Sequence, residues 1–533
     1  MMMPWKKKKL IRKLAEAYGK EPDCEYYAGD LDWIRTYYDG CRTDSRDPFY
    51  VDETTWNDLN LDEVFRRINA CQSTAGEQYL YYMLRRPADR KTAGELKGLI
   101  HLAEERPEIR QRVQLLLCGI GRERRMDLGT FFRPKDTSPF WLAMYLLLGM
   151  LFILSILTVP LFGAHFAVLP VILLGFNAFF HEYRRNRCEH EIRRVNYCVS
   201  LVCALHRMRK LRIPELDRYL ADAYGHLDRM KSVIRSGPVM SGLNGDVIQD
   251  AMANFLLVDL VAFEILKKRL DRYHEHFLAV HEAIGRIDAS IAVSSYRASL
   301  DSWCEPEMDY ESERPFIHAE GIAHPMLKEP VLNDLSLEKS MLITGSNASG
   351  KSTYLRSSIL CALMAETLCT CICKSYTGTP FRIYTSIALS DDLLAGESYY
   401  IAEIRSLKRI LDEQKKEGFV LCALDEVLRG TNTIERIASS AEILKALDKP
   451  GTLCMIATHD AELCSLAGEG YRLAHFEETV SDTEIHFDYK LKPGPAETRN
   501  AIHLLKLMGF DDDIVSAAHS RADHYVKTGK WSG

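Results

Sequence analysis

Two long apolar stretches dominate the pattern of hydrophobic and polar positions. Phe140–Thr158 and Phe166–Phe180 are almost wholly apolar, and residues 139–181 contain no Asp, Glu, Lys or Arg. A helix of about 19 residues is about 28 Å long, close to the thickness of the hydrocarbon core of a bilayer. Pro160 and Gly163 lie between the two stretches. The pattern therefore predicts a transmembrane hairpin of two helices over residues 139–181.

Basic residues flank the predicted hairpin on both sides. They are Arg122, Arg124, Arg125, Arg133 and Lys135 before it, and Arg184, Arg185, Arg187, Arg193 and Arg194 after it. Because basic flanks favour the cytoplasmic side, we expect a two-span, multi-pass membrane protein with the rest of the chain in the cytoplasm. The alternative is a pair of buried core helices, although such helices rarely run so far without a polar face. The basic run after the hairpin suits lipid headgroups or DNA phosphates.

Helical patterns fill the chain on either side of the hairpin, in residues 56–138 and 182–312. One long helix is predicted between Pro238 and Pro306, where apolar residues recur at alternating spacings of three and four. This apolar seam consists of Phe263, Leu266, Leu270, Tyr273, Phe277, Val280, Ile284, Ile287 and Ile291. We expect this helix to act as a stiff lever, with Gly285 as a soft point. Residues 1–55 form a basic, partly helical N-terminal region.

Short apolar strands alternate with helical stretches after residue 313. The predicted strands are Met341–Thr344, Phe381–Tyr384, Phe419–Leu424 and Thr452–Ala457. This alternation is typical of a parallel α/β sheet. The predicted fold class is thus α plus α/β, with a helical core and lever domain that the hairpin interrupts, and a C-terminal α/β domain over residues 313–533.

A glycine-rich loop follows the first of these strands and precedes a predicted helix, Tyr354–Leu368. Such a loop cradles the phosphates of a nucleotide, because its backbone N–H groups and the helix N-terminus face the anion. In this pattern Lys351 contacts the β and γ phosphates and Ser352 binds Mg²⁺. The predicted ATP-binding residues are Gly345, Ser346, Asn347, Ala348, Ser349, Gly350, Lys351, Ser352 and Thr353.

Acidic residues end the strand Phe419–Leu424, and a histidine follows the strand Thr452–Ala457. Asp425 is placed to hold Mg²⁺ together with Ser352. Glu426 is placed to orient and deprotonate the attacking water, and His459 to sense the γ-phosphate. The sequence therefore predicts an ATPase with Glu426 and His459 as catalytic residues.

Composition narrows the choice of ligands. Lys and Arg total 68 against 74 Asp and Glu, a net charge of −6, so any contact with nucleic acid must come from a local patch. Fifteen cysteines without a spaced framework indicate reduced intracellular thiols. Cys369, Cys371 and Cys373 suggest a metal site, but three thiols without a fourth ligand make a poor zinc site, so we interpret them as buried core thiols.

The chemical motifs together resemble the MutS family of mismatch-repair ATPases, within the ABC ATPase superfamily. The segments that carry the likeness include the phosphate loop with Asn347, Ser390–Glu403, Leu428–Thr433, Asp488–Lys492, His324–Pro325 and Asn333–Asp334. Upstream, Leu61–Pro87 with Ser73-Thr-Ala-Gly76 resembles the start of the family's helical core. Ile287–Ala292 and the residues that follow resemble the lever helix that returns to the ATPase domain.

The resemblance implies that two ATPase domains pair and bury two ATP molecules. Ser398 of one subunit would reach the γ-phosphate bound by the other, and the loop Leu428–Thr433 would cross the interface of a homodimer. The implied ligand is mismatched or branched DNA. Hydrolysis would switch the helical levers between arrangements.

This sequence departs from the family pattern in places. We expect the roughly 55 residues before the helical core to be too few for the mismatch-reading domain with its Phe-x-Glu wedge. Val331 and Leu332 stand where the family often stacks an aromatic ring on adenine. These departures leave an alternative function: a membrane-tethered ATPase switch that recruits partner proteins without recognising mismatches. A transport ATPase is a third interpretation, disfavoured because two spans cannot line a substrate path alone.

Overall fold

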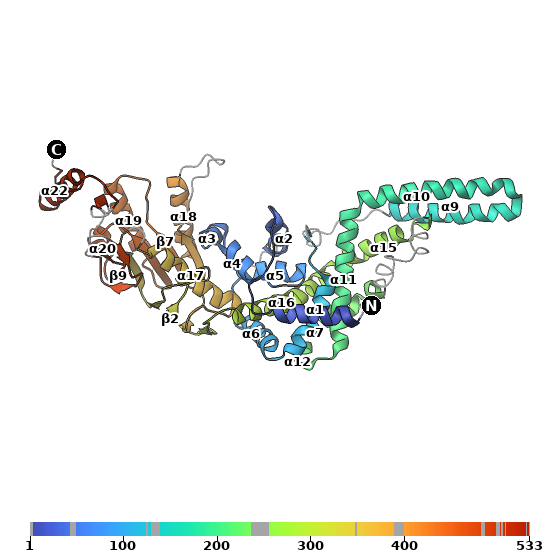
Figure 1. Ribbon diagram of the computed structural model, residues 1–533, viewed down its shortest axis with the longest axis horizontal. Helices are drawn as coiled ribbons and strands as arrows, with labels where there is room; N and C mark the ends of the chain where they lie inside the picture. The colour runs from blue at the N-terminus through green and yellow to red at the C-terminus, as the bar shows by residue number, and fades with distance from the viewer. Residues whose placement is uncertain are drawn as a thin grey trace. The chain divides into compact units, whose positions relative to one another are not determined.

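The structure is a computed structural model (Figure 1). It describes residues 4–42, 49–123, 126–128, 139–235, 255–346, 349–387, 399–480, 485–496, 502, 505–506, 508–528 and 530–531. The chain forms two compact units, each built from separate segments. The helical unit comprises Met1–Pro48, Phe65–Met83 and Gly94–Ser299, and the sheet unit comprises Phe49–Val64, Leu84–Ala93 and Leu300–Gly533. The domain limits predicted at residues 55, 138, 181 and 312 stay a prediction.

Helices make up the first unit, as the sequence predicted for residues 56–138 and 182–312. Most bury one apolar face; α12, for example, begins with a proline in its first turn and buries Leu216, Leu220, Ala223 and Leu227. The helices are α1 (Pro4–Ala17), α2 (Asp30–Arg42), α6 (Arg90–Glu105), α7 (Pro107–Ile120), α9 (Phe140–Phe162), α10 (Val168–Arg187), α11 (Glu189–Leu211), α12 (Pro214–Arg229), α15 (Val258–Arg272) and α16 (His274–Ala298). Two more, α4 (Leu61–Ile68) and α5 (Thr74–Arg85), contain residues of both units.

Two helices, α9 and α10, are long and apolar enough to cross a membrane. They lie side by side and are joined by Gly163 and the short 3₁₀ helix η1 (Ala164–Ala167) (Figure 1). Most of their large apolar side chains are exposed, among them Leu154 at 52%. Pro160, predicted in the turn, instead lies inside α9. Proline has no N–H to donate to the Ile156 carbonyl, so the last turn of α9 lacks one helical hydrogen bond.

Polar contacts fasten the base of this hairpin to α15. Asn177 is fully buried, and its amide donates to Phe255 O at 2.8 Å and to Leu148 O at 3.4 Å. The second of these bonds crosses from α10 to α9. His181 pairs with Asp259 at 2.8 Å. Buried polar groups that are bonded in this way fix one register of helices against each other.

Arg184 also belongs to the base of the hairpin. Its guanidinium donates to the Tyr145 hydroxyl at 2.9 Å and lies 3.6 Å from the centre of the Trp141 ring. Only 7% of the residue is exposed. Arg184 is therefore not available to lipid headgroups or DNA phosphates, in contrast to the prediction for the basic run.

The predicted long helix between Pro238 and Pro306 is interrupted. Tyr273 separates α15 from α16, with φ −106° and ψ 25°. Hydrogen bonds still span the break, because Tyr273 N donates to Arg269 O and Phe277 N donates to Tyr273 O. The other eight residues of the predicted apolar seam are buried, whereas Tyr273 is partly exposed. The packing periodicity was thus predicted correctly, and the continuity of the lever was not.

Gly285 on α16 is a point of close contact and not a soft point. A Cβ atom at this position would lie 2.6 Å from both Ala75 O and Tyr79 Cβ of α5. Gly76 on α5 plays the matching part, since its Cβ would lie 2.6 Å from Asp288 Cγ. Glycine at these two positions lets α5 and α16 approach closely.

Asp288 ties together two segments that the sequence singled out separately. Its carboxylate accepts hydrogen bonds from the Ser73 hydroxyl at 2.6 Å, from Ser73 N at 2.8 Å and from Gln72 N at 3.0 Å. Burial raises the pKa of Asp288 to about 6. The start of α5 is thereby held on α16.

A six-stranded sheet forms the centre of the second unit. Its strand order is β12-β9-β4-β8-β7-β6, and every neighbouring pair is parallel except β12 and β9. The strands are β4 (Ser340–Thr344), β6 (Arg382–Ser386), β7 (Val420–Asp425), β8 (Thr452–Thr458), β9 (Tyr471–His475) and β12 (Lys492–Pro493). The four predicted strands are confirmed as β4, β6, β7 and β8, and the parallel sheet is confirmed with them.

Smaller sheets accompany the central one. The first has the order β1-β5-β2-β3, from β1 (Glu307–Met308), β2 (Ile317–Ile322), β3 (Asn333–Leu337) and β5 (Ser375–Gly378). The second pairs β10 (Glu478–Val480) with β11 (Ile485–Phe487).

Helices cover both faces of the central sheet, which explains why its strands are continuous apolar runs. Side chains of α18 (Tyr399–Glu413), α19 (Thr433–Leu447) and α20 (Glu462–Leu466) pack with Val420, Cys422 and Leu424 of β7. The helix α17 (Lys351–Leu368) also contacts β7 and β8. The last described helix is α22 (Asp512–Thr528).

The edge strand β6 is covered by a short helix from far upstream, α3 (Glu53–Asp58). The Asp58 carboxylate accepts from Ile387 N at 2.9 Å and from the Thr385 hydroxyl at 2.7 Å. The Thr55 hydroxyl accepts from Thr385 N at 3.2 Å, and Arg409 donates to Thr385 O at 2.6 Å. Side chains thus satisfy the outward N–H and C=O of Thr385 and the N–H of Ile387.

Candidate nucleotide-binding site

Three neighbouring strands, β4, β8 and β7, bring the predicted chemistry together. They run parallel, so their carboxyl ends meet at one edge of the sheet. The glycine-rich loop follows β4, His459 follows β8, and Asp425 and Glu426 end β7. In open α/β sheets, ligands bind at this edge.

The described part of the glycine-rich loop depends on glycine at both ends. Gly345 has φ +145°, and a Cβ there would lie 2.5 Å from Phe476 O. Gly350 has φ +103° and stands directly before α17, where a side chain would press on the Tyr489 ring at 3.0 Å. The loop therefore passes from strand to helix in a conformation that places the helix N-terminus at the site.

Lys351 lies inside the loop. Its ammonium group donates to Gly345 O at 2.8 Å and to Ser346 O at 2.7 Å, and the residue is only 5% exposed. Burial lowers the pKa of Lys351 to about 8. A cation held at this cost in solvation is strongly attracted to an entering anion.

Ser352 and Asp425 form the candidate metal site. The Ser352 hydroxyl donates to Asp425 Oδ2 at 2.5 Å. Both groups offer oxygen atoms, the ligands that Mg²⁺ prefers together with waters and phosphate oxygens. The donor set therefore fits the predicted ion.

Glu426 is held by two basic side chains. Its Oε1 pairs with His459 Nε2 at 2.8 Å, and its Oε2 accepts from Arg429 Nε at 2.7 Å. The hydrogen bond from His459 and the charge of Arg429 hold the pKa of Glu426 below its ordinary value, against the effect of burial. Glu426 also has φ +58°, a strained conformation for a residue with a side chain. The backbone conformation and the two partners therefore hold this carboxylate in one orientation at the wall of the cavity.

Residues around the site hold these side chains in place. Glu403 on α18 is buried and accepts from Arg429 N at 3.0 Å, and burial raises its pKa. Asp460 accepts both branches of the Arg436 guanidinium at 2.6 and 2.9 Å, which fixes the loop after β8 on α19. Asn432 caps α19 by accepting from Glu435 N.

A cavity of about 820 Å³ opens at these residues. It suits a nucleotide, because ligand pockets are typically a few hundred to about 1,000 Å³. Of the predicted residues, those lining it are Ser346, Ser349, Gly350, Lys351, Ser352, Thr353, Asp425, Glu426 and His459. Gly345 closes the loop behind Lys351. Asn347, Ala348 and Ser398 lie outside the described residues.

Sequence reasoning missed part of this cavity. The sequence analysis assigned Arg429 only to a dimer interface, yet its guanidinium contacts Glu426. Its position three residues after the acidic residue at the strand end could have indicated this contact. Tyr489 also lines the cavity, close to Gly350. Its backbone carbonyl accepts from Asn333 Nδ2 at 2.9 Å. Val331 lines the cavity as well, at the position where an aromatic ring is absent from this sequence.

The sequence comparisons agree with this geometry. The family described as MutS domain V matches residues 341–525. The chain is 30% identical over 268 residues to the DNA mismatch repair protein MutS of Natronomonas pharaonis, 48% of this chain and 30% of the relative. It is 32% identical over 234 residues to the DNA mismatch repair protein MutS of Lactobacillus gasseri, and the match covers 42% of this chain and 27% of that relative. It is 34% identical over 285 residues to the DNA mismatch repair protein MutS 2 of Haloarcula marismortui, and the match covers 46% of this chain and 30% of that relative.

The fold and the site define a parallel α/β domain with a glycine-rich loop and acidic strand ends at one edge of its sheet. The comparisons make the assignment of this domain narrower: residues 341–525 match the family described as MutS domain V, and the relatives that the chain resembles are MutS proteins. The matched segments span about a third of the length of these relatives.

Proposed function

We propose that this protein is a membrane-anchored ATPase of the MutS type, with an ABC-type ATPase domain. The observation that carries the proposal is the convergence of Lys351, the Ser352–Asp425 pair and the Glu426–His459 pair on one cavity. MutS-family proteins are generally ATPases, and the matched region includes all of these residues.

The side chains divide the work of ATP hydrolysis among them. Lys351 exchanges its loop carbonyls for β and γ phosphate oxygens. Glu426 orients the attacking water, and its lowered pKa keeps it ionised for that purpose. His459 touches both Glu426 and Lys351, the latter at 3.4 Å, and so connects the water with the γ-phosphate. Ser352 and Asp425 hold Mg²⁺, which neutralises charge on the phosphates when bound.

Two copies of the chain complete the site in this proposal. Ser398 of one subunit reaches the γ-phosphate bound by the other, and the loop Leu428–Thr433 lies at the homodimer interface. The backbone of this loop is anchored on the buried Glu403 and leads into α19. Closing on ATP and opening after hydrolysis would then move α15 and α16 by differential affinity for the two states.

The hairpin α9–α10 anchors the protein in a bilayer, and the ATPase domain lies in the cytoplasm. The exposed apolar side chains of both helices support this part of the proposal, since water would otherwise surround them. The two span candidates are Phe140–Phe162 and Ala164–Arg187.

Mismatched or branched DNA is the proposed ligand, in keeping with the names of the relatives. The second candidate function is a membrane-tethered switch that recruits partner proteins, and the exposed hairpin favours it. ATP turnover measured with homoduplex, mismatched and branched DNA separates the two. Stimulation by mismatched or branched DNA supports the repair function, and no binding or stimulation by any of the three discards it.

Nucleotide retention tests the ATP site itself. We expect the purified full chain to retain ATP with magnesium, and Lys351→Ala to weaken retention at least about tenfold, because an ammonium–phosphate contact is lost. Lys339→Ala is the matched control, because Lys339 is an exposed lysine in the turn between β3 and β4. Equal retention by Lys351→Ala and wild type would overturn the proposal.

A further inference from the structure

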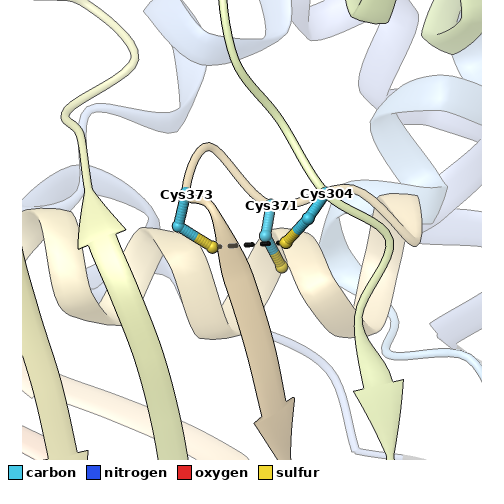
Figure 2. A group of neighbouring side chains, drawn as sticks. All are labelled: Cys304, Cys371 and Cys373. Atoms are coloured by element: carbon cyan, nitrogen blue, oxygen red, sulfur yellow. Dashed lines mark hydrogen bonds between the residues drawn. The ribbon is translucent and has the colours of Figure 1, made fainter.

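Four cysteine thiols gather at one place in the sheet unit. Cys371 and Cys373 follow α17, and Cys304 lies just before β1 (Figure 2). Cys361 lies on α17. The sulfur atoms of Cys304, Cys371 and Cys373 all lie within 4.8 Å of one another. Cys304 Sγ is 3.4 Å from Cys373 Sγ, and Cys361 Sγ is 3.8 Å from Cys373 Sγ. The sequence motif thus supplies two members of the group, and the fold adds two more.

Cys369, the third cysteine of the motif, stands apart. It ends α17 with φ +50°, and its thiol points to Ala93 O at 3.7 Å. The alternation expected of a strand is broken at this residue, so Cys369 does not share a face with Cys371 and Cys373. Cys304 and Cys361 add two thiols to Cys371 and Cys373, so four thiols are available to one metal ion.

The sulfur atoms of Cys304, Cys371 and Cys373 lie close enough together to share one metal ion, and Cys361 approaches this group beside Cys373. Zinc–sulfur bonds of about 2.3 Å in a tetrahedron place the sulfur atoms about 3.8 Å apart. Two of the six separations are 3.4 Å (Cys304–Cys373) and 3.8 Å (Cys361–Cys373), so one lies just below that value and the other equals it. Cys361, Cys371 and Cys373 are buried and Cys304 is partly buried, which matches a closed structural site.

The backbone prepares this arrangement without a metal. Cys304 and Cys371 form an antiparallel bridge, each N–H donating to the carbonyl of the other at 2.9 Å.

We propose that Cys304, Cys361, Cys371 and Cys373 bind one structural zinc ion as thiolates. Binding releases the thiol protons, and no oxidant or reductant takes part. The ion would connect the segment before β1, which carries Cys304, to α17, which carries Cys361 and begins at Lys351. The inference does not depend on the proposed function, because metal retention and nucleotide retention are measured separately.

Metal content of the full chain tests the inference. The protein is purified in detergent with a reductant and without chelator, after growth with zinc. We expect about one zinc per chain by elemental analysis. Exchange with cobalt(II) should give the visible absorption bands of a tetrahedral thiolate complex. Cys371→Ser and Cys373→Ser should lose the metal, whereas Cys369→Ser, a neighbouring buried thiol outside the group, should keep it.

Thermal stability gives a second measurement. A chelator should lower the melting temperature of wild type and of Cys369→Ser, and leave that of Cys371→Ser unchanged. Wild type alone decides the matter if the variants misfold. A reduced wild-type chain without zinc and without cobalt bands would overturn the inference. So would bound iron, or a disulfide between Cys304 and Cys373 in the freshly purified chain.

Discussion

His459 Nε2 lies 2.8 Å from Glu426 Oε1, and this contact links the loop after β8 to the end of β7. Glu426 meets Arg429 on its other oxygen. The carboxylate is therefore positioned from both sides before any water is placed.

Glu426→Gln should uncouple ATP binding from hydrolysis. The amide keeps the size of the side chain and one acceptor oxygen, but it cannot orient and take a proton from water as a carboxylate does. We expect a loss of about 10²–10⁴-fold in turnover with nucleotide binding retained. The variant should accumulate as an ATP-bound dimer, measured by phosphate release and light scattering.

The control for this variant is Glu442→Gln, a carboxylate exposed on α19 and paired with Lys445 at the surface. It should hydrolyse ATP as wild type does. Wild-type turnover in Glu426→Gln would remove Glu426 from its catalytic role.

Gly285→Ala should destabilise the helical unit. The added methyl group would lie 2.6 Å from Ala75 O and Tyr79 Cβ, so α5 and α16 must separate. We expect a loss of about 1–3 kcal/mol in the free energy of unfolding. Gly225→Ala on α12 is the matched control, because a Cβ there meets nothing within 4 Å. It should stabilise by about 0.5–1 kcal/mol. Thermal melting of both variants distinguishes close contact from mere helix propensity, and equal shifts would refute the contact.

Stability should depend on pH through His281. This residue is fully buried on α16, it contacts Gln78 Oε1 at 3.0 Å, and burial lowers its pKa to about 3. Because the unfolded chain takes up a proton near pH 6.5 and the folded chain does not, the contribution is complete above pH 6.5 and declines as the pH falls towards 3.

Comparison with His281→Gln isolates this effect from that of Asp288, whose raised pKa acts in the opposite direction. The stability of wild type relative to the variant should fall by about 2 kcal/mol between pH 6.5 and pH 5. Melting curves at several pH values measure it. A difference that does not change with pH would show that His281 has the same pKa in the folded and the unfolded chain.

Leu154→Arg should weaken membrane insertion. Leu154 lies in the middle of α9 and is 52% exposed, so a charge there would face lipid. Such a charge costs about 2.5–3.5 kcal/mol at the centre of a span. The fraction of protein that resists extraction from membranes should fall, and Leu154→Ala should behave as wild type.

Proteolysis of sealed vesicles tests the orientation of the anchor. Protease should cut the proposed ATPase domain from the cytoplasmic face alone. Recovery of wild type in the soluble fraction would contradict the anchor.

The strands around the site were predictable because each is a short apolar run with turn residues at both ends. The loop chemistry at Gly345–Thr353 followed from the same local pattern. Asp288 and Ser73 lie 215 residues apart in the sequence, and no local pattern reports their hydrogen bond. Cys304 and Cys361 were missed for the same reason, because their approach depends on how the segment before β1 crosses α17. The break at Tyr273 was hidden because the apolar seam keeps its spacing through it.

The cover that α3 gives to β6 has a practical consequence for dissecting this protein. A fragment that starts near residue 313 would contain the whole parallel sheet but not Thr55 and Asp58. The uncovered edge strand β6 could then pair with a strand of another chain, and such pairing leads to aggregation. Attempts to isolate the sheet unit should therefore include residues 49–64, either in the same chain or as a separate peptide.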